Sequence, residues 1–418
     1  MNCKKRKGNH KFGFGGMMEM IYIAKDIPLW QVTIWDKKFN NVDKKWQPKT
    51  IKYKYLLSDE LDSLRVDDGD VRILYTGKDV GFTTEELAGD RLSEGEIISI
   101  PWGGIPTVKY HKGKFVTGDN RIATSKDINK LTNKYLYYFM RGNIHEIASY
   151  YRGASLKHPC MKDILKMTIS YPSVQEQDKI CGQFDVLEQI IEVRKQELQL
   201  LDDLIKARFV EMFGDPVHSD KYGTRKLSSC VAEKTDMVDG PFGSQVNTKI
   251  DYIAKGEIPV IRTVNVKKMS FSPVDLKYMT RKKYETVIRS QVLPGDVILT
   301  KVGTIGNVCV FPDTYKEAVL STTGSCRIRV DNSIVNTEFF AYNLLYLKSK
   351  LLEIASAGVQ PFLNMNHVKN IDILNVPLGK QTKFADFVHK FDKSKVAVQK
   401  ALDETQMLFD SLMQKYFG

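Results

Sequence analysis

An internal repeat is the feature of this sequence that most constrains its fold. The segment Gln177 to Gly214 aligns with Gln381 to Gly418 at a constant offset of 204 residues, without a gap. Phe213-Gly214 matches Phe417-Gly418, and a looser similarity continues upstream of both segments. Because a repeat of this size indicates two copies of one structural unit, we expect each half to be a globular domain of about 160–175 residues followed by a segment of about 40.

The two 40-residue segments are predicted to be long helices. Apolar residues recur at alternating steps of four and three, which is the heptad seam of paired helices. Arg194 and Arg208 interrupt the first seam; either their aliphatic stems cover the seam edge or they make a specific buried pairing. Each helix could instead pack only on its own domain. The predicted seam consists of Ile180, Phe184, Leu187, Ile191, Leu198, Leu201 and Ile205 in the first helix, and Phe384, Val388, Phe391, Val398, Leu402, Phe409 and Leu412 in the second.

The predicted architecture is α+β, with two repeated domains separated by two long antiparallel helices in a pseudo-two-fold arrangement. We expect a domain at 20–174, a helix at 175–214, a second domain at 215–376 and a second helix at 377–418. In the first domain, alternating aromatic stretches such as 30–35 and 53–56 precede a strand at 97–100 and a helix at 133–149. The second contains strands at 259–262 and 295–300 and a helix at 338–356. Residues 1–19 are either a translated leader or a disordered basic arm.

Composition narrows the class of protein. The chain has 418 residues, a net charge of +12 and six scattered cysteines with no Cys-x-x-Cys pair. No apolar run approaches the length of a membrane span, so a cytoplasmic, reduced protein is expected. The predicted helices carry almost no net charge, so the excess positive charge lies on the globular domains. A polyanionic partner would therefore bind there.

Motifs of catalysis are missing from the sequence. There is no Gly-x-Gly-x-x-Gly, no phosphate-binding Gly-Lys-Ser/Thr loop and no His-Glu-x-x-His. Asn-Pro-Pro-aromatic, the tetrapeptide with which amino-methylating enzymes hold a flipped base, does not occur. The seven histidines have no metal-ligand spacing. We therefore predict no catalytic residue, no metal site and no cofactor bound by this chain.

Several polar clusters suit DNA. Arg and Asn read the edges of guanine and adenine, whereas Lys suits phosphates. The alternative for each such residue is an ordinary solvated surface position, and the Gly103-Gly104 and Gly303/Gly306 motifs suit ordinary turns. The candidates are Trp102, Lys109, Lys114, Asn120 and Arg121 in the first domain, and Ser244, Gln245, Asn247, Arg262, Asn265, Lys267, Lys268, Lys301 and Thr304 in the second.

With these motifs in view, the sequence resembles the DNA-specificity subunit of type I restriction–modification systems. The resemblance covers nearly the whole chain, and its motifs are specific together although weak singly. They are Pro241-Phe242-Gly243-Ser244, Ile258-Pro259-Val260-Ile261-Arg262 with Asn265, Gly295-Asp296-Val297-Ile298, Gly303-Thr304-Ile305-Gly306, and Pro172 followed by Gln175-Glu176-Gln177-Asp178-Lys179-Ile180. The second helix begins Gly379-Lys380-Gln381 and lacks the Glu-Gln start.

The resemblance implies a division of labour. Each domain would read one half of a split double-stranded DNA target, and the helices would fix the gap and dock two methylation subunits. Those subunits would bring S-adenosylmethionine, and restriction subunits would bring ATP and Mg²⁺. Two other classes stay open at this point: a self-contained restriction or modification enzyme, which needs a catalytic domain, and a two-headed repressor.

Overall fold

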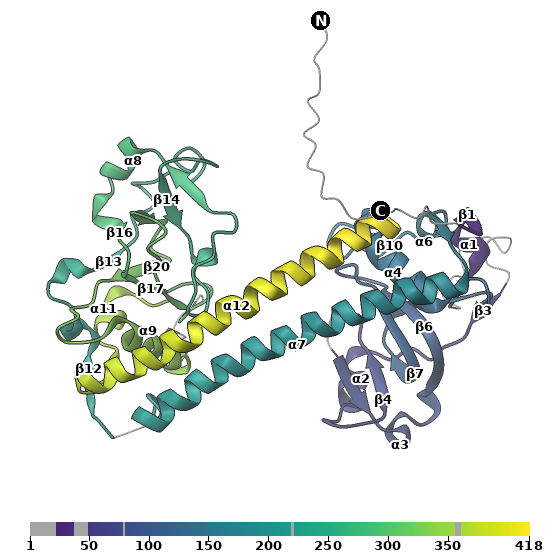
Figure 1. Cartoon of the computed structure of the whole chain (residues 1–418), viewed down its shortest axis with the longest axis horizontal. Helices are drawn as coiled ribbons and strands as arrows, with labels where there is room; N and C mark the ends of the chain where they lie inside the picture. The colour runs from purple at the N-terminus through teal and green to yellow at the C-terminus, as the bar shows by residue number, and fades with distance from the viewer. Residues whose placement is uncertain (1–21, 37–48, 78–79, 219–220, 356–360) are drawn as a thin grey trace, which may run out of the picture. The chain divides into compact units, whose positions relative to one another are not determined.

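The computed structural model describes residues 22–36, 49–77, 80–218, 221–355 and 361–418 (Figure 1). The chain divides into two units. The first comprises residues up to Val193 together with 401–418, and the second comprises Arg194–Lys400. Each unit therefore contains one mixed domain, one end of the first long helix and the opposite end of the second. The predicted leader or arm at 1–19 lies outside the described residues.

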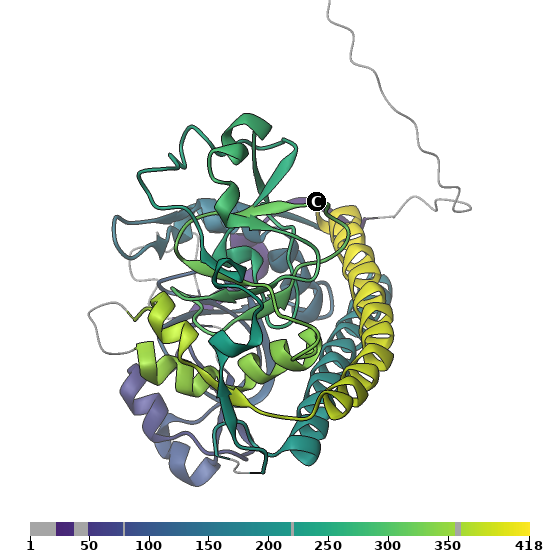
Figure 2. The same ribbon diagram turned by 90° about the vertical axis from the view of Figure 1, so that its left-hand side faces the viewer.

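Two helices of 40 residues dominate the secondary structure, α7 (Val174–Phe213) and α12 (Leu378–Phe417). Their bounds lie within one residue of the predicted ones. In the first unit, the rings of Phe184 and Phe409 lie 5.3 Å apart; in the second, Phe209 and Phe384 are also 5.3 Å apart. In both units the start of one helix thus packs on the end of the other, so the pair is antiparallel (Figure 2). The predicted α+β class with two long helices is confirmed.

The register of the sequence repeat recurs in the packing. By the offset of 204, Phe184 and Phe409 of the first unit correspond to Val388 and Ile205 of the second, and all four are buried in the core of their unit. The predicted seam residues all lie on the inward side of the helices. Buried are Ile180, Phe184, Leu187, Ile191, Ile205, Phe384, Val388, Val398 and Phe409; half-buried are Leu198, Leu201, Phe391, Leu402 and Leu412.

The last turns of α7 depart from the heptad. Phe209 and Phe213 are fully buried, whereas Arg208, a predicted seam position, keeps 39% of its side chain exposed above the ring of Phe387. A step of four replaces the step of three because this end of α7 packs on its own domain as well as on α12. Phe209 stacks on Phe339 with the ring centroids 5.7 Å apart. Arg194 stays half-exposed and pairs with Glu197 at 2.8 Å.

The first unit is built on a curved seven-stranded sheet of order β3-β2-β8-β6-β7-β4-β5. Helix α4 packs on one face of this sheet, and α7 packs on α4 through Tyr138 and Phe184, whose rings lie 4.8 Å apart.

The strands of the first unit are β1 Ala24–Pro28, β2 Thr33–Asp36, β3 Thr50–Ile51, β4 Val71–Leu74, β5 Val80–Thr83, β6 Ser93–Pro101, β7 Lys109–Thr117, β8 Asn120–Ser125, β9 Tyr151–Arg152, β10 His158–Pro159 and β11 Thr168–Tyr171. The helices are α1 Leu29–Val32, α2 Ser58–Ser63, α3 Glu85–Ala88, η1 Gly89–Arg91, α4 Asn133–Gly142, α5 Ile144–Ser149 and α6 Met161–Ile164.

Two elements of the first unit differ from expectation. The aromatic stretch at 30–35 is not one strand, because α1 occupies its first half and β2 its second. The single helix predicted at 133–149 is broken at Asn143, whose side chain donates to the carbonyl of Phe417 (3.0 Å). A Cβ on Gly142 would lie 2.9 Å from the Cβ of Phe417, so glycine there lets the end of α12 approach.

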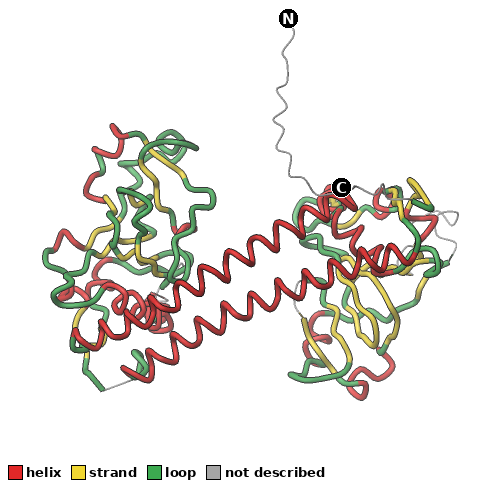
Figure 3. The backbone as a smooth tube through the Cα atoms, viewed as in Figure 1, coloured by secondary structure: helices red, strands yellow, loops and turns green. Residues whose placement is uncertain are grey.

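The second unit contains two four-stranded sheets, of orders β13-β20-β17-β18 and β15-β14-β19-β16. Their short strands alternate with long loops (Figure 3), and the helix predicted at 338–356 is broken at Leu347 into α9 and α10. The strands are β12 Thr224–Lys226, β13 Met237–Asp239, β14 Ile258–Ile261, β15 Lys277–Met279, β16 Gln291–Val292, β17 Val297–Thr300, β18 Val308–Val310, β19 Ala318–Leu320, β20 Ser325–Ile328 and β21 Asp372–Leu374. The helices are η2 Leu227–Cys230, η3 Lys234–Asp236, η4 Thr263–Asn265, α8 Arg281–Glu285, η5 Ile288–Ser290, α9 Thr337–Tyr346, α10 Lys348–Ala355 and α11 Met365–Lys369.

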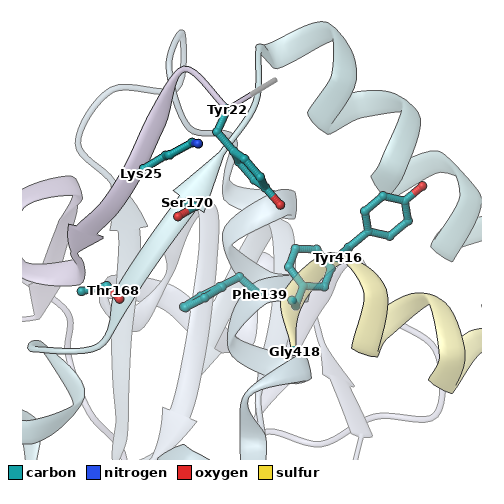
Figure 4. Close-up of a pocket in the computed structure, with 8 residues that line it drawn as sticks. Tyr22, Lys25, Phe139, Thr168, Ser170, Tyr416 and Gly418 are labelled. Carbon is teal, nitrogen blue, oxygen red and sulfur yellow. The ribbon is translucent and has the colours of Figure 1, made fainter. Parts of the chain in front are cut away.

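The end of α12 lies beside the start of the first domain. A pocket of about 320 Å³ is lined by Gly418 and Tyr416 on one side and by Tyr22 and Lys25 on the other (Figure 4). The repeat predicts this proximity, because after Gly214, the equivalent of Gly418, the chain runs directly into the second domain. The first and last described residues of the chain, Tyr22 and Gly418, therefore lie close together in the first unit.

Closure of the chain can be tested by circular permutation. We expect a chain that begins near Asp215, with Gly418 joined to Met20 by a short linker, to fold with a thermal unfolding midpoint within a few degrees of the natural order, because no buried contact is cut. Circular dichroism and thermal melts measure this. A permuted chain without cooperative unfolding would contradict the proximity of Tyr22 and Gly418.

An ion pair joins the helices in the second unit. Lys395 of α12 donates to Asp202 of α7 at 2.6 Å, and both side chains are about one-quarter to one-third exposed. We expect a double-mutant cycle of Asp202→Asn and Lys395→Met, read from unfolding midpoints, to give a coupling of about 1 kcal/mol. The more exposed pair Arg194–Glu197 within α7 is the control and should couple more weakly. Equal coupling in the two cycles would refute a specific role for the interhelical pair.

Candidate nucleic-acid interface

Strand ends of the second unit converge on one edge. Thr300, the last residue of β17, pairs with Ser325, the first of β20, and Asp239 at the end of β13 pairs with Cys326. The ends of the parallel strands β14 and β19 lie side by side, with Ile261 opposite Leu320. The loops that follow these strand ends therefore meet. We call the loops 240–250, 262–265, 301–307 and 321–325 the rim.

Hydrogen bonds and close backbone approaches tie the rim loops to one another. The hydroxyl of Tyr252, two residues after the first rim loop, donates to the Ser321 carbonyl (3.0 Å), and the N–H of Lys301 donates to the Gly324 carbonyl (2.8 Å). A Cβ on Gly240 would lie 2.0 Å from the carbonyl oxygen of Thr322, so only glycine fits where these loops cross. The rim is therefore held in one arrangement by the sheets beneath it.

The predicted DNA-binding residues of the second domain divide by exposure. Ser244, Gln245, Asn247 and Thr304 are exposed on the rim. Amides and hydroxyls are the groups that read base edges, so the rim presents suitable chemistry. Sequence reasoning missed three apolar side chains beside them: Phe242, which is 56% exposed, Val264 and Val302. An exposed apolar residue in a loop gives no periodic signal by which sequence could have found it.

Local bonds shape the loop at 241–250. The side chain of Gln245 accepts from the N–H of Phe242 (3.0 Å), and the carboxylate of Asp251 accepts from the N–H of Asn247 (2.7 Å). This backbone bond is the largest cause of the lowered pKa of the Asp251 carboxyl, and a hydrogen bond from Lys283 adds to it. The carboxylate therefore stays ionised and keeps the loop turned.

Lys267 and Lys268 are exposed on a turn next to the rim. The ammonium of Lys268 lies 3.9 Å from the carboxylate of Asp202 on α7, so the turn flanks the rim on the side of the long helices. Exposed ammonium groups at such a place suit the phosphates of DNA. That these two lysines contact DNA stays a prediction.

Asn265 and Lys301 do not face solvent, contrary to the sequence-based expectation that they contact DNA. Asn265 is fully buried: its oxygen accepts from the N–H of Arg262 (3.1 Å) and its nitrogen donates to the carbonyls of Ser272 and Val274. Lys301 is buried and its ammonium pairs with Asp239. Both side chains pair with polar groups beneath the rim, so they fix the shape of the rim and are not exposed on its surface.

The first unit shows the same pattern, and it corrects two further predictions. Arg121 is 1% exposed, donates to the carboxylate of Asp36 (2.9 Å), and lies over the ring of Trp102 with its guanidinium carbon 4.5 Å from the centroid. Asn120 is equally buried, and its side chain donates to the Leu74 carbonyl (2.9 Å). Neither side chain is available to a base edge, because each is enclosed by its own domain.

The remaining predicted DNA-binding residues of the first unit, Lys109, Lys114 and Trp102, already make contacts within their own domain. Lys109 donates to the carbonyls of Tyr75, at 2.5 Å, and of Gly77; Lys114 pairs with Glu85. Trp102 is half-buried between Arg121 and His158. The most exposed side chain of the neighbouring loop is Ile105, at 77%, which the sequence did not single out.

No metal cluster or membrane span is found within the described ranges. No group of three or more His, Cys, Asp or Glu side chains there could hold a metal ion. None of the helices in these ranges has both the length and the apolar character needed to cross a bilayer.

The fold and the rim together define a class of protein: two mixed domains on a pair of long antiparallel helices, with polar loops presented on a basic chain. Residues 62–202 and 241–405 match the family described as the type I restriction modification DNA specificity domain. Because these matches cover well over half of the chain, the protein belongs to this family. The two matches end at positions that the sequence repeat places one residue apart. Family membership does not favour the self-contained enzyme or the repressor.

A solved structure shows the same fold. The crystal structure of a type I restriction–modification S subunit from M. genitalium has a TM-score of 0.57 and 15% identity, over 97% of this chain and 98% of that one. An HsdS subunit from Thermoanaerobacter tengcongensis has a TM-score of 0.35 and 16% identity, over 86% of this chain and 92% of that one. A structure from work on complex assembly and conformational transition of the type I system has a TM-score of 0.45 and 16% identity, over 86% and 93%.

The buried position of Asn265 predicts a stability effect. We expect Asn265→Ala to destabilise the second unit by about 2–4 kcal/mol, because it leaves two carbonyls and one N–H without partners. The exposed Asn247→Ala should leave the thermal unfolding midpoint nearly unchanged and serves as the matched control. An unchanged melting curve for Asn265→Ala would contradict this hydrogen-bond network.

The exposed lysines predict an effect on DNA affinity. In the assembled restriction–modification complex, Lys267→Ala with Lys268→Ala should weaken binding to all duplexes alike. The slope of log affinity against log salt should become shallower by about 0.9 for each phosphate that no longer meets a lysine. Fluorescence anisotropy over a salt series measures this. Lys226→Ala with Lys234→Ala, both exposed on the second domain away from the rim, is the control and removes equal charge. An equal change in the salt slope for the control would contradict a specific role of Lys267 and Lys268.

Proposed function

We propose that this chain is the non-catalytic DNA-reading subunit of a type I restriction–modification complex. Each domain reads one half of a bipartite double-stranded target, and α7 and α12 set the number of unread base pairs between the halves. The observation that carries the proposal is the rim, where loops from five strand ends expose Ser244, Gln245, Asn247 and Thr304 on a hydrogen-bonded framework. Family membership supports the same role.

The partners follow from this role. Two methylation subunits dock on the helices and supply S-adenosylmethionine and adenine methylation. Restriction subunits supply ATP- and Mg²⁺-dependent cleavage, and the complex works in the cytoplasm. A purely reading role is supported by two carboxylates near the rim that are paired with cations, Asp251 with Lys283 and Asp275 with Arg262. Such pairs stabilise ionised carboxylates, whereas acid–base catalysis separates the pKa values of neighbouring groups.

Mapping methylated adenines in the host genome tests the function. We expect one bipartite motif that disappears when the gene for this chain is deleted and returns with it. Because the two domains differ strongly in sequence, the two half-sites should differ as well. Exchange of residues 215–376 for the domain of a relative should change one half-site and leave the other intact. A methylome that is indifferent to this gene would overturn the proposal.

The spacing role gives a second prediction. Insertion of one heptad after Glu197 in α7 and another at Ala401 in α12 keeps the seam in register. It lengthens both helices by about 10 Å, which corresponds to roughly three base pairs of rise. The methylated motif should keep both halves and gain spacer. Insertion in α7 alone is the control and should abolish methylation, since the seam loses its partner positions. An unchanged spacer with both insertions would rule out the helices as the determinant of spacing.

A further inference from the structure

A pocket of about 310 Å³ opens within the rim of the second unit. Three separate segments line it: Thr248 from the first loop, Arg262 and Thr263 after β14, and Ser321, Thr322 and Ser325 around the start of β20. Five of these six side chains bear hydroxyls and the sixth is a guanidinium. None of the residues that line the pocket carries a carboxylate.

The guanidinium of Arg262 is anchored on one side only. Nη2 donates to the carboxylate of Asp275 at 2.7 Å and to its carbonyl, while Nε, which is buried, has no partner within the described part of the chain. Hydrogen bonds from Lys277 and then Arg262 lower the pKa of the Asp275 carboxyl, so it stays ionised. With Lys277 included, this group of three carries a net positive charge beside the pocket.

The hydroxyl side of the pocket is also fixed in place. The Tyr252 hydroxyl lies 2.5 Å from that of Ser321 and 3.0 Å from its carbonyl oxygen, which orients the Ser321 side chain. Gly324 forms part of the wall, where an added Cβ would lie 3.1 Å from Cγ2 of Thr263. The absence of a side chain at Gly324 therefore keeps the pocket open between Thr263 and Thr322.

This geometry suits a tetrahedral anion better than a base edge. A base presents its acceptors in one plane, and a single side chain can meet two of them. Here hydroxyls arrive from three segments around a hollow, with one cation at its side. Oxygens that point in several directions, as in a phosphate group, match donors placed in this way.

We propose that the pocket binds one phosphodiester of the DNA backbone, with Arg262 as its cation and Thr248, Thr263 and Thr322 as hydroxyl donors. The proposal rests on the proposed DNA-reading function and assigns Arg262 to a phosphate rather than to a guanine edge. A phosphate held there fixes the position of the duplex over the rim. Phosphate contacts set the register, and the neighbouring Ser244, Gln245 and Asn247 then meet the bases.

Two variants and one control test the site in the full chain assembled with its methylation subunits. Arg262→Gln removes the cation and leaves Asp275 paired with Lys277 at 2.7 Å. Gly324→Ala narrows the pocket without a change of charge, at a position whose φ is not in the left-handed region. Arg225→Gln, on β12 outside the rim, removes one arginine charge as the control. Thermal melts confirm that each variant is folded.

Affinity for duplexes with and without the methylated motif is measured over a salt series. We expect both rim variants to weaken binding about tenfold for every sequence alike. The salt slope should become shallower by about 0.9, and the control should match the natural chain. Two results would overturn the proposal: both rim variants binding as the natural chain does, or Arg262→Gln altering the preference at one base pair with an unchanged slope.

A second measurement separates this site from the proposed function. Dimethyl phosphate is titrated with the natural chain and the three variants, and its ³¹P line width is followed. The natural chain and Arg225→Gln should broaden the line, whereas Arg262→Gln and Gly324→Ala should broaden it much less. Equal broadening by all four chains refutes the pocket even if the natural chain reads its motif. Loss of broadening in the rim variants, with a chain that shows no sequence preference, keeps the pocket and refutes the reading function.

Discussion

The fold depends on the burial of aromatic side chains where the ends of α7 and α12 meet. In the first unit Phe184 packs on Phe409 and Phe417, and in the second Phe209 packs on Phe384 and Phe339. Each buried phenylalanine contributes about 1.5–3 kcal/mol of hydrophobic stabilisation. Because each cluster draws on both helices and on the domain beside them, neither domain has a complete core without the helix ends.

The strand ends that carry the rim loops of the second unit take no part in these aromatic clusters. The polar groups there are fixed by buried partners, with Asn265 beneath one loop and the Lys301–Asp239 pair beneath another. In the first unit the Arg121–Asp36 pair is enclosed in the same way. Buried ion pairs of this kind hold the backbone in place, because removal of one partner leaves an uncompensated buried charge. The buried pairs therefore fix the backbone from which the exposed loops project.

The apolar periodicity and the constant offset of the repeat predicted the long helices and their seam, because both patterns can be read from the sequence without knowledge of tertiary packing. It could not separate Asn265 from Asn247, or Arg121 from Arg262. An exposed amide or guanidinium that is available to DNA has the same chemistry as one that satisfies a buried carbonyl or carboxylate, and only tertiary packing decides which of the two is exposed. Phe209 and Phe213 were missed for a related reason. A strict heptad selects Arg208 and Met212, whereas the true packing positions change step where α7 meets α9.

The two helix pairings are similar but not equivalent, and the difference has a consequence for partner choice. The repeat places Gln406 and Ile191 in the first unit where the second has Asp202 and Lys395. Ile191 is buried, and Gln406 donates to Asp410 within its own helix at 2.9 Å, so this pairing contains no interhelical charge. If α7 paired with a second α7, Asp202 would meet the isoleucine and lose its cation. A half-buried carboxylate without a partner opposes that pairing, whereas α12 supplies the lysine. The ion pair therefore favours closure of the chain on itself over association of two identical halves.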